Sequence, residues 1–206
     1  MSDIFKVALL MAIFAVLGTS LVATTHSLTE QRIKDNEKNA LLNNLHSLIP
    51  PIAHDNDLFN DTMTISSPEL LGTPDDITVY RARFRTAPVA MALHTVAPDG
   101  YNGKIKLLVA IRYDGVVIGV RVISHKETPG LGDRIEADRS DWIKQFKGKS
   151  FSNPEKSLWK VKKDGGVFDQ FTGATITPRA VVKAVANCLV LFHTYKEQLF
   201  REDEEF

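Results

Sequence analysis

The sequence contains only one cysteine, Cys188, among its 206 residues. A single thiol cannot form a disulfide within the chain, and it is too few for an iron–sulfur cluster, which takes several thiolates. Cys188 lies within an apolar helical pattern, where cysteine is expected to be a small buried hydrophobic residue. If the protein carries electrons, we therefore expect its cofactor to be organic.

The sequence also has no net charge, since 25 Lys and Arg residues balance 25 Asp and Glu residues. This balance disfavours nucleic-acid binding and gives no field for an acidic substrate. No glycine fingerprint for a nucleotide follows a predicted strand, so NADH has no evident docking site. The histidines show no metal-ligand spacing, and a zinc site has little support. They are His26, His46, His54, His94, His125 and His193.

Charged residues are missing from residues 7–25, most of which are apolar. As a helix this segment would span roughly 28 Å, close to the thickness of a bilayer's hydrocarbon core. A cleaved signal peptide is the alternative, but the apolar region is longer than a usual signal core and no clear small-x-small cleavage site follows. We favour an uncleaved anchor. The flanking charges, Lys6 beside Asp3 and mixed signs after Thr29, barely decide its orientation.

Between the anchor and the first clear strand we expect a helix and then an irregular connection. Residues 29–48 carry Leu41, Leu45 and Leu48 at helical spacing before Pro50 and Pro51 stop the pattern. This leucine stripe is expected to pack on its own domain rather than on a partner subunit. Residues 52–76 predict a surface connection with one short strand. We therefore divide this part of the chain into an anchor (1–28) and a linker (29–76).

An antiparallel sheet is predicted over residues 77–124. Residues 77–85 alternate, with Tyr80, Ala82 and Phe84 on a buried face. The other face carries arginines, which we expect to be solvated rather than bound to phosphate; they are Arg81, Arg83 and Arg85. Residues 89–96 predict a second strand, followed by a turn at residues 99–103. Residues 105–113 and 116–124 flank Asp114-Gly115, a strong hairpin signal.

The remainder of the domain is predicted to be largely helical. We expect a helix over residues 135–146 with Trp142 in the core, and a short strand over residues 158–161. Residues 178–200 have apolar side chains at helical spacing and predict a closing helix, too polar to span a membrane. Residues 201–206 form a charged tail. The domain itself is assigned to residues 77–200.

The stretch from Asp169 to Pro178 joins a glycine-containing loop to this last helix. Thr177 and Pro178 are typical of an N-cap and a first helical residue. A helix start presents free N–H groups and a positive dipole end, which favour an anion. Residues 173–174 leave the backbone open to its approach, beside Thr175. On these grounds alone, the stretch is either an anion site or an ordinary capped loop.

The pattern Asp169-x-x-Thr172-Gly173-Ala174-Thr175 resembles the flavinylation motif of the FMN-binding domain family, whose last threonine carries FMN through a phosphoester bond. Residues 127–133 and 159–166 resemble the same family, in the same order. The likeness extends from the anchor to the last helix. It is strongest to the G subunits of Rnf electron-transport complexes and weaker to the C subunits of sodium-translocating NADH:quinone reductases.

The resemblance implies an α+β FMN-binding domain, with an antiparallel sheet and flanking helices, on one transmembrane helix. It implies that an FMN transferase moves FMN from FAD onto Thr175 and reads Asp169. Apart from the resemblance, the adjacent Lys162 and Lys163 could offset the negative charge of the phosphate or of the reduced ring, although two adjacent lysines are usually just solvated. Further cofactor-binding residues are expected around the phosphate and the isoalloxazine ring. They are Thr172, Gly173, Ala174, Thr177, Glu127, Thr128, Pro129, Gly130, Leu131 and Gly132.

The family role implied is electron transfer in a bacterial inner-membrane complex, with the FMN domain on the periplasmic side. Such a complex passes electrons between ferredoxin and NAD, coupled to sodium or proton movement, and its other membrane subunits are the expected partners. We expect a relay without catalytic residues or a substrate pocket of its own. The alternatives are the C subunit of the quinone reductase and a non-redox anchored binding module.

Overall fold

The computed structural model describes residues 2–201 and divides the chain into two units, residues 1–43 and 44–206. The first unit belongs to helix α1 (Ser2–Leu48), whose described side chains are exposed up to Ala40. The mean hydropathy of α1 reaches 2.3, and the helix is long and apolar enough to cross a membrane. The predicted tail at residues 202–206 lies outside the described residues.

The second unit is built on a five-stranded antiparallel sheet in which each strand pairs with the next along the chain. This arrangement confirms the α+β prediction, the short strand before residue 77 and the hairpin at Asp114-Gly115, where Gly115 has a φ of +87°. The strands are β1 (Thr62–Ile65), β2 (Ile77–Phe84), β3 (Ala87–Gly100), β4 (Gly103–Arg112) and β5 (Val117–Ser124).

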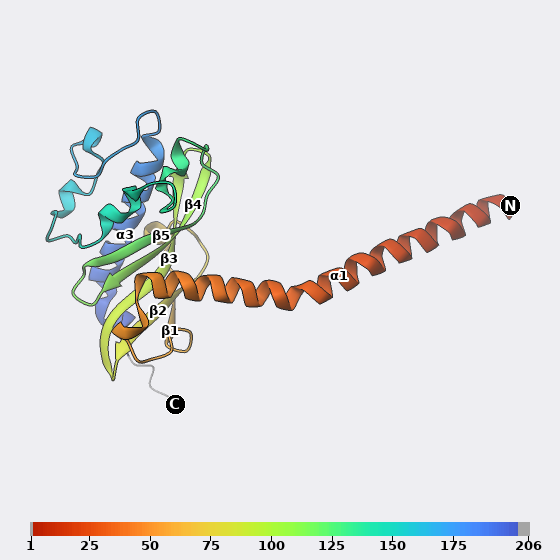
Figure 1. The fold of residues 1–206 in the computed structure, drawn as a ribbon, viewed down its shortest axis with the longest axis horizontal. Coiled ribbons are helices and arrows are strands. Elements are labelled where there is room, and N and C mark those ends of the chain that lie inside the picture. The colour runs from red at the N-terminus through yellow and green to blue at the C-terminus, as the bar shows by residue number, and fades with distance from the viewer. Residues whose placement is uncertain (1, 202–206) are drawn as a thin grey trace. The chain divides into compact units, whose positions relative to one another are not determined.

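Helix α3 (Ile176–Leu199) lies along one face of this sheet (Figure 1). Its buried side chains share one core with Val79, Leu93 and Leu107 of the strands. Cys188 is fully buried there, as predicted, and burial raises the pKa of its thiol to about 12. By length and a mean hydropathy of 1.2, α3 is apolar enough to cross a membrane, contrary to our expectation, but 61% of that window is buried in the domain.

A smaller core covers the opposite face of the sheet. Alternate residues of β4 point away from α3, and two of them, Leu108 and Ala110, are fully buried outside the main cluster. Leu45, Leu48 and Ile49, at the end of α1, are buried as well. A Cβ added at Gly119 of β5 would lie 2.8 Å from Leu48 Cδ2, so the two segments touch closely. Leu45 and Leu48 of the leucine stripe pack on their own domain, as predicted.

The segment between β5 and α3 differs from the sequence prediction. Instead of a helix over residues 135–146 it forms two short 3-10 helices, η2 (Gly132–Ile135) and η3 (Asp141–Phe146). The strand predicted at 158–161 is also wrong, because these residues form only one bridge, Val161 to Phe168. The remaining short helices are η1 (Pro51–Ala53), α2 (Pro68–Leu71), η4 (Lys156–Leu158) and η5 (Lys162–Asp164).

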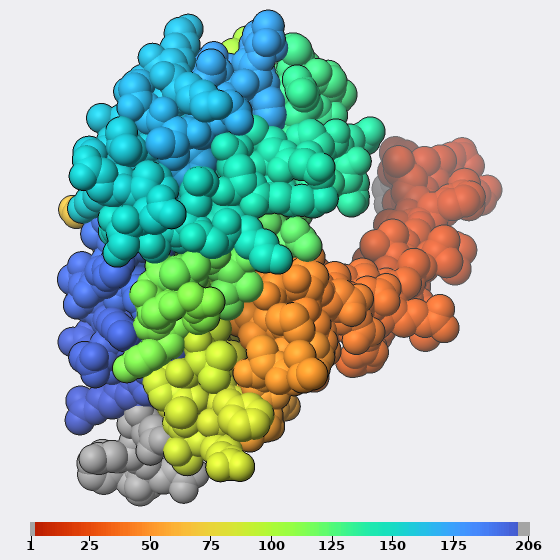
Figure 2. Space-filling model, turned by 60° about the vertical axis from the view of Figure 1, so that its left-hand side comes forward, coloured from red at the N-terminus to blue at the C-terminus, as the bar shows by residue number. Residues whose placement is uncertain are grey.

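Aromatic packing accounts for this irregular path. Trp142 and Phe146 are 5.5 Å apart between ring centroids, and Phe168 lies 4.8 Å from Phe146 and 5.0 Å from Trp159. These rings fill the core at the end of the sheet, which confirms the prediction for Trp142. The chain between them gathers at that end of the domain, in teal and light blue (Figure 2). Large aromatic rings bury enough area to override local helix and strand preferences.

The arginines of β2 are the second departure from prediction. Arg81 and Arg83 are only 4% and 8% exposed, whereas the sequence placed them on a solvated face. Both pair with Asp61, at 2.5 Å and 2.7 Å, and Arg83 also donates to the carbonyl of Phe200 at 2.9 Å. Buried arginine requires such partners. The cluster therefore fastens β2 to the segment before β1 and to the end of α3.

We expect Asp61→Ala to lower the free energy of unfolding by about 3 kcal/mol or more, because it leaves two buried guanidinium groups without their carboxylate. Urea unfolding monitored by circular dichroism measures the change. Asp141→Ala is the matched control, since Asp141 pairs with Lys144 on the surface and should contribute about 1 kcal/mol or less. Equal losses in the two variants would contradict a special role for the buried cluster.

Candidate functional site

A cavity of about 630 Å³ lies where the loop after β5 meets the start of α3. Its volume is within the range of small-molecule sites in proteins. The cavity joins two segments that the sequence predicts to be functional, residues 127–132 and 172–177. The residues that line it are Tyr101, Glu127, Thr128, Leu131, Gly132, Lys163, Gly173, Ala174, Thr175, Ile176 and Thr177.

Glu127 connects three sides of this cavity. The residue is 4% exposed, and its Oε1 accepts a hydrogen bond from the backbone N–H of Asn102, 3.0 Å away in the β3–β4 turn. Its Oε2 accepts a hydrogen bond from the hydroxyl of Thr177. The backbone N–H of Glu127 itself donates to Nδ1 of His125 at 3.0 Å. These bonds hold the loop, the turn and the helix start together.

Helix α3 begins two residues earlier than the sequence predicted. Its N-cap is Thr175 and its first residue is Ile176, whereas we expected Thr177 and Pro178 in those positions. The physical reason is that the Thr177 hydroxyl is taken by the buried carboxylate of Glu127, so it does not cap the helix. Residues 175–177, at the start of α3, line the cavity, and the first N–H groups of a helix have no partner within it, which suits an anion.

Thr175 presents its hydroxyl at this helix start. The residue is half-buried, and within residues 2–201 its hydroxyl makes no hydrogen bond. The loop before it is closed by a bond from the N–H of Ala174 to the carbonyl of Phe171, 3.1 Å apart. Gly173 has a φ of +83°, a conformation that favours glycine. The hydroxyl is therefore exposed to the cavity and available as an acceptor of a phosphoryl group.

The loop of residues 127–132 folds back over the cavity. The N–H groups of Leu131 and Gly132 both donate to the carbonyl of Thr128 at 3.1 Å, and the Thr128 hydroxyl accepts a bond from the Asn102 side chain at 3.0 Å. Leu131 remains 44% exposed and lines the cavity. The loop thus supplies an apolar surface of the kind on which a flat ring can pack.

Five predicted site residues lie near the cavity without lining it. Among them, Asp169 forms a salt bridge with Lys162 at 2.5 Å. Its backbone carbonyl accepts a hydrogen bond from Trp142 Nε1 at 2.7 Å. Lys163, and not Lys162, lines the cavity. The five are Asp169, Thr172, Pro129, Gly130 and Lys162.

Two residues that line the cavity were not predicted from the sequence. Tyr101 occupies the β3–β4 turn and is 65% exposed, and Ile176 is 44% exposed. An aromatic residue between the turn signals Asp99-Gly100 and Asn102-Gly103 is unusual for a solvated turn, and this was the available clue. Ile176 carried no such signal, because a single apolar residue at a helix start is common.

The cavity combines the features that FMN requires. Leu131, Tyr101 and Ile176 offer apolar contact for a ring, and the start of α3 offers N–H groups to a phosphate. The free hydroxyl of Thr175 lies at the same helix start. Within residues 2–201, no group of three or more His, Cys, Asp or Glu side chains is placed to hold a metal ion. The residues present therefore fit a phosphorylated flat ligand.

Comparison with known proteins agrees with this fit. Residues 100–190 match the FMN-binding domain family, and residues 1–48 match the RnfG N-terminal region. A protein of Shewanella oneidensis, named as the G subunit of an ion-translocating oxidoreductase complex, is 47% identical over 98% of this chain and 95% of its own. The protein of the same name from Vibrio atlanticus is 51% identical over 90% of this chain and 88% of its own.

We expect Thr177→Val to lower the free energy of unfolding by about 1–3 kcal/mol, because it removes a hydrogen-bond donor from the buried Glu127 carboxylate without changing side-chain shape. Chemical denaturation of the full chain in detergent measures the loss. Thr172→Val makes the same chemical change at an exposed position of the loop that precedes α3 and should stay within about 0.5 kcal/mol of wild type. A neutral Thr177→Val would mean that this contact does not hold the site.

Proposed function

Because the chain belongs to the family of G subunits of ion-translocating oxidoreductase complexes, we propose that it is a membrane-anchored electron carrier with FMN bound covalently to Thr175. One observation carries this proposal. The free hydroxyl of Thr175, the N-terminus of α3 and the loop of residues 127–132 line a single cavity. Their convergence supports a site for a phosphate joined to a flat ring.

The attachment requires an FMN transferase and FAD as the donor. A bond forms between Thr175 Oγ1 and the FMN phosphorus while the pyrophosphate bond of FAD breaks, so that AMP leaves and the hydroxyl loses its proton. The hydroxyl suits this reaction because no hydrogen bond to the described part of the chain has to be broken first. Asp169, exposed on the preceding loop, is the residue that we propose the transferase reads.

Once FMN is attached, this chain's residues position it. The N–H groups at the start of α3 would hold the phosphate, and Leu131 and Tyr101 would offer contact to the ring. Thr172, Gly173 and Ala174 shape the loop that carries the phosphoester. Lys163 supplies positive charge on the cavity, whereas the charge of Lys162 is largely neutralised by its pairing with Asp169. FMN itself supplies the capacity to accept and donate electrons.

In the assembled complex the domain would act as one relay between ferredoxin and NAD, with electron transfer coupled to sodium or proton movement. Its partners would be the other membrane subunits of an Rnf-type complex. We propose that the chain is not catalytically complete alone, since its cavity is accounted for by the cofactor. The names of its relatives favour this assignment over the C subunit of the quinone reductase.

We expect Thr175→Ala to abolish covalent flavin when the chain is made in cells that contain the transferase. Wild-type protein, denatured and separated on a gel, should show yellow flavin fluorescence in its band, and intact mass should confirm one FMN. Thr175→Ser is the matched control and should retain part of the signal, because a hydroxyl remains. Flavin persisting in Thr175→Ala would move the attachment elsewhere, and colourless wild-type protein would favour a non-redox binding module.

We also expect the domain to lie on the periplasmic side of the inner membrane, anchored by the single span of residues 7–25 in α1. Protease added to intact spheroplasts should then digest the chain beyond Thr29. A cytoplasmic marker protein should survive in the same sample. Protection of the domain until the inner membrane is lysed would place FMN on the cytoplasmic side and contradict this topology.

A further inference from the structure

The side-chain carboxyl group of Glu127 is buried in the wall of the cavity. Its two described partners, the backbone N–H of Asn102 and the hydroxyl of Thr177, are neutral donors. Among the ion pairs formed within residues 2–201, none involves Glu127. Burial of a charge without an opposite charge costs several kcal/mol, and neutral hydrogen bonds offset only part of this cost.

The backbone closes around this carboxylate on two sides. A Cβ added at Gly132 would lie 2.8 Å from Oε2, and one added at Gly100 would lie 3.0 Å from Oε1. Any larger residue at Gly132 would displace the Glu127 side chain. The carboxylate is therefore held in one place, although glutamine would accept the same N–H bond at lower electrostatic cost. A fixed charge at this position calls for an explanation beyond stability.

Electrostatics explains why a charge would be kept at this position if the cavity binds a flavin. Uptake of two electrons and one proton leaves one net negative charge on an isoalloxazine ring. A fixed carboxylate in the same cavity opposes that charge, and burial makes the repulsion stronger than it would be in water. Lys163, on the cavity rim, is exposed and lies where water screens its charge. The buried charge should dominate.

We propose that Glu127 lowers the reduction potential of the flavin by holding a fixed negative charge in the cavity wall. This inference rests on the proposed function, and it gives the carboxylate an electrostatic role in addition to its contact with the ligand. A low potential would suit a carrier that must hand its electrons on readily. The shape of the loop and the charge of Glu127 can be separated by substitution.

The test uses the full-length chain, loaded with FMN in cells, purified in detergent and titrated against redox dyes. Glu127→Gln keeps the shape and removes the charge. At a fixed applied potential, its ratio of reduced to oxidised flavin should rise at least about tenfold, which is about 30 mV for two electrons. The flavin-free Thr175→Ala/Glu127→Gln protein should unfold at the same urea concentration as Thr175→Ala or at a higher one, because an unpaired buried charge is gone.

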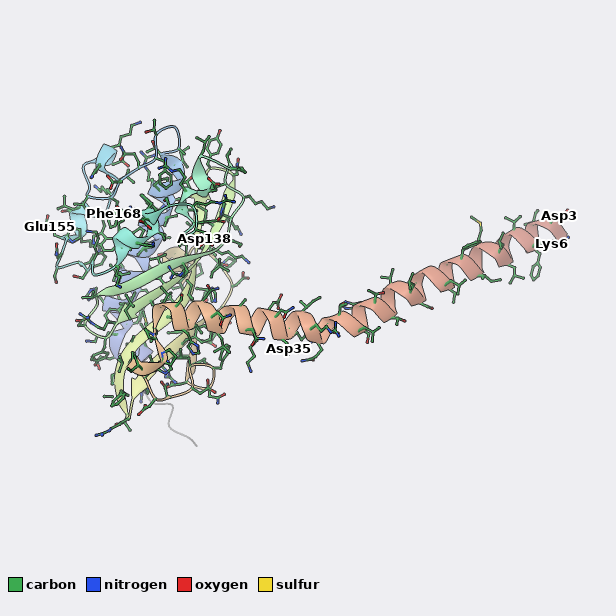
Figure 3. All side chains as sticks on the ribbon, viewed as in Figure 1. Asp3, Lys6, Asp35, Asp138, Glu155 and Phe168 are labelled. Atoms are coloured by element: carbon green, nitrogen blue, oxygen red, sulfur yellow. The ribbon has the colours of Figure 1, made fainter. Side chains whose placement is uncertain are left out.

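Two further variants separate charge from shape. Glu127→Asp keeps the charge but shortens the side chain, so its midpoint potential should shift less than that of Glu127→Gln, even if its stability falls. Glu155→Gln is the matched control, because Glu155 is exposed on the outer edge of the domain and its carboxylate accepts a hydrogen bond from the nearby Ser157 hydroxyl (Figure 3). Its midpoint potential should not change.

The outcomes distinguish this inference from the proposed function. Wild-type protein without flavin would overturn the proposed function and the inference with it. Loaded wild type with an unchanged midpoint in Glu127→Gln would overturn the inference alone. The inference would also fall if Glu127→Asp shifted the midpoint as much as Glu127→Gln, or if Glu127→Gln failed to fold or load, since either result would make Glu127 a structural residue.

Discussion

The hydrogen bond between Glu127 and Thr177 joins two segments that lie 50 residues apart and both line the cavity. The same carboxylate reaches the β3–β4 turn through Asn102. The sheet and α3 bring these three segments to one end of the domain, but their side chains fix the distances between them. The geometry of the whole cavity, including the position of Thr175, therefore depends on a buried acid whose own placement is costly.

Much of the fold was predictable because its signals are local. Alternation indicated β2, turn signals and Asp114-Gly115 indicated the strands that follow and the central hairpin, and apolar spacing indicated α3. The burial of Cys188 followed from the same helical pattern. The meeting of residues 127–132 with Thr175 was not available from periodicity. It came from the resemblance to FMN-binding domains, because no rule of spacing links loops so far apart in sequence.

The wrong predictions share a physical cause, which is a partner distant in sequence. Alternation shows that Arg81 and Arg83 share a face but not that Asp61 and the end of α3 would bury that face. Thr177 had the right residue type for an N-cap, but Glu127 competes for its hydroxyl. The helix expected over residues 135–146 does not form, because aromatic rings pack around Phe146 in this segment.

The last turn of α1 has a consequence for how the domain can be separated from its anchor. Leu45, Leu48 and Ile49 are part of the smaller core, and the missing side chain of Gly119 leaves room for Leu48. A soluble fragment that began after Ile49 would bare the strand face that these residues cover and would tend to aggregate. One that began a few residues before Leu45 would keep that face sealed, so the anchor's final turn belongs to the folding unit and not to the tether.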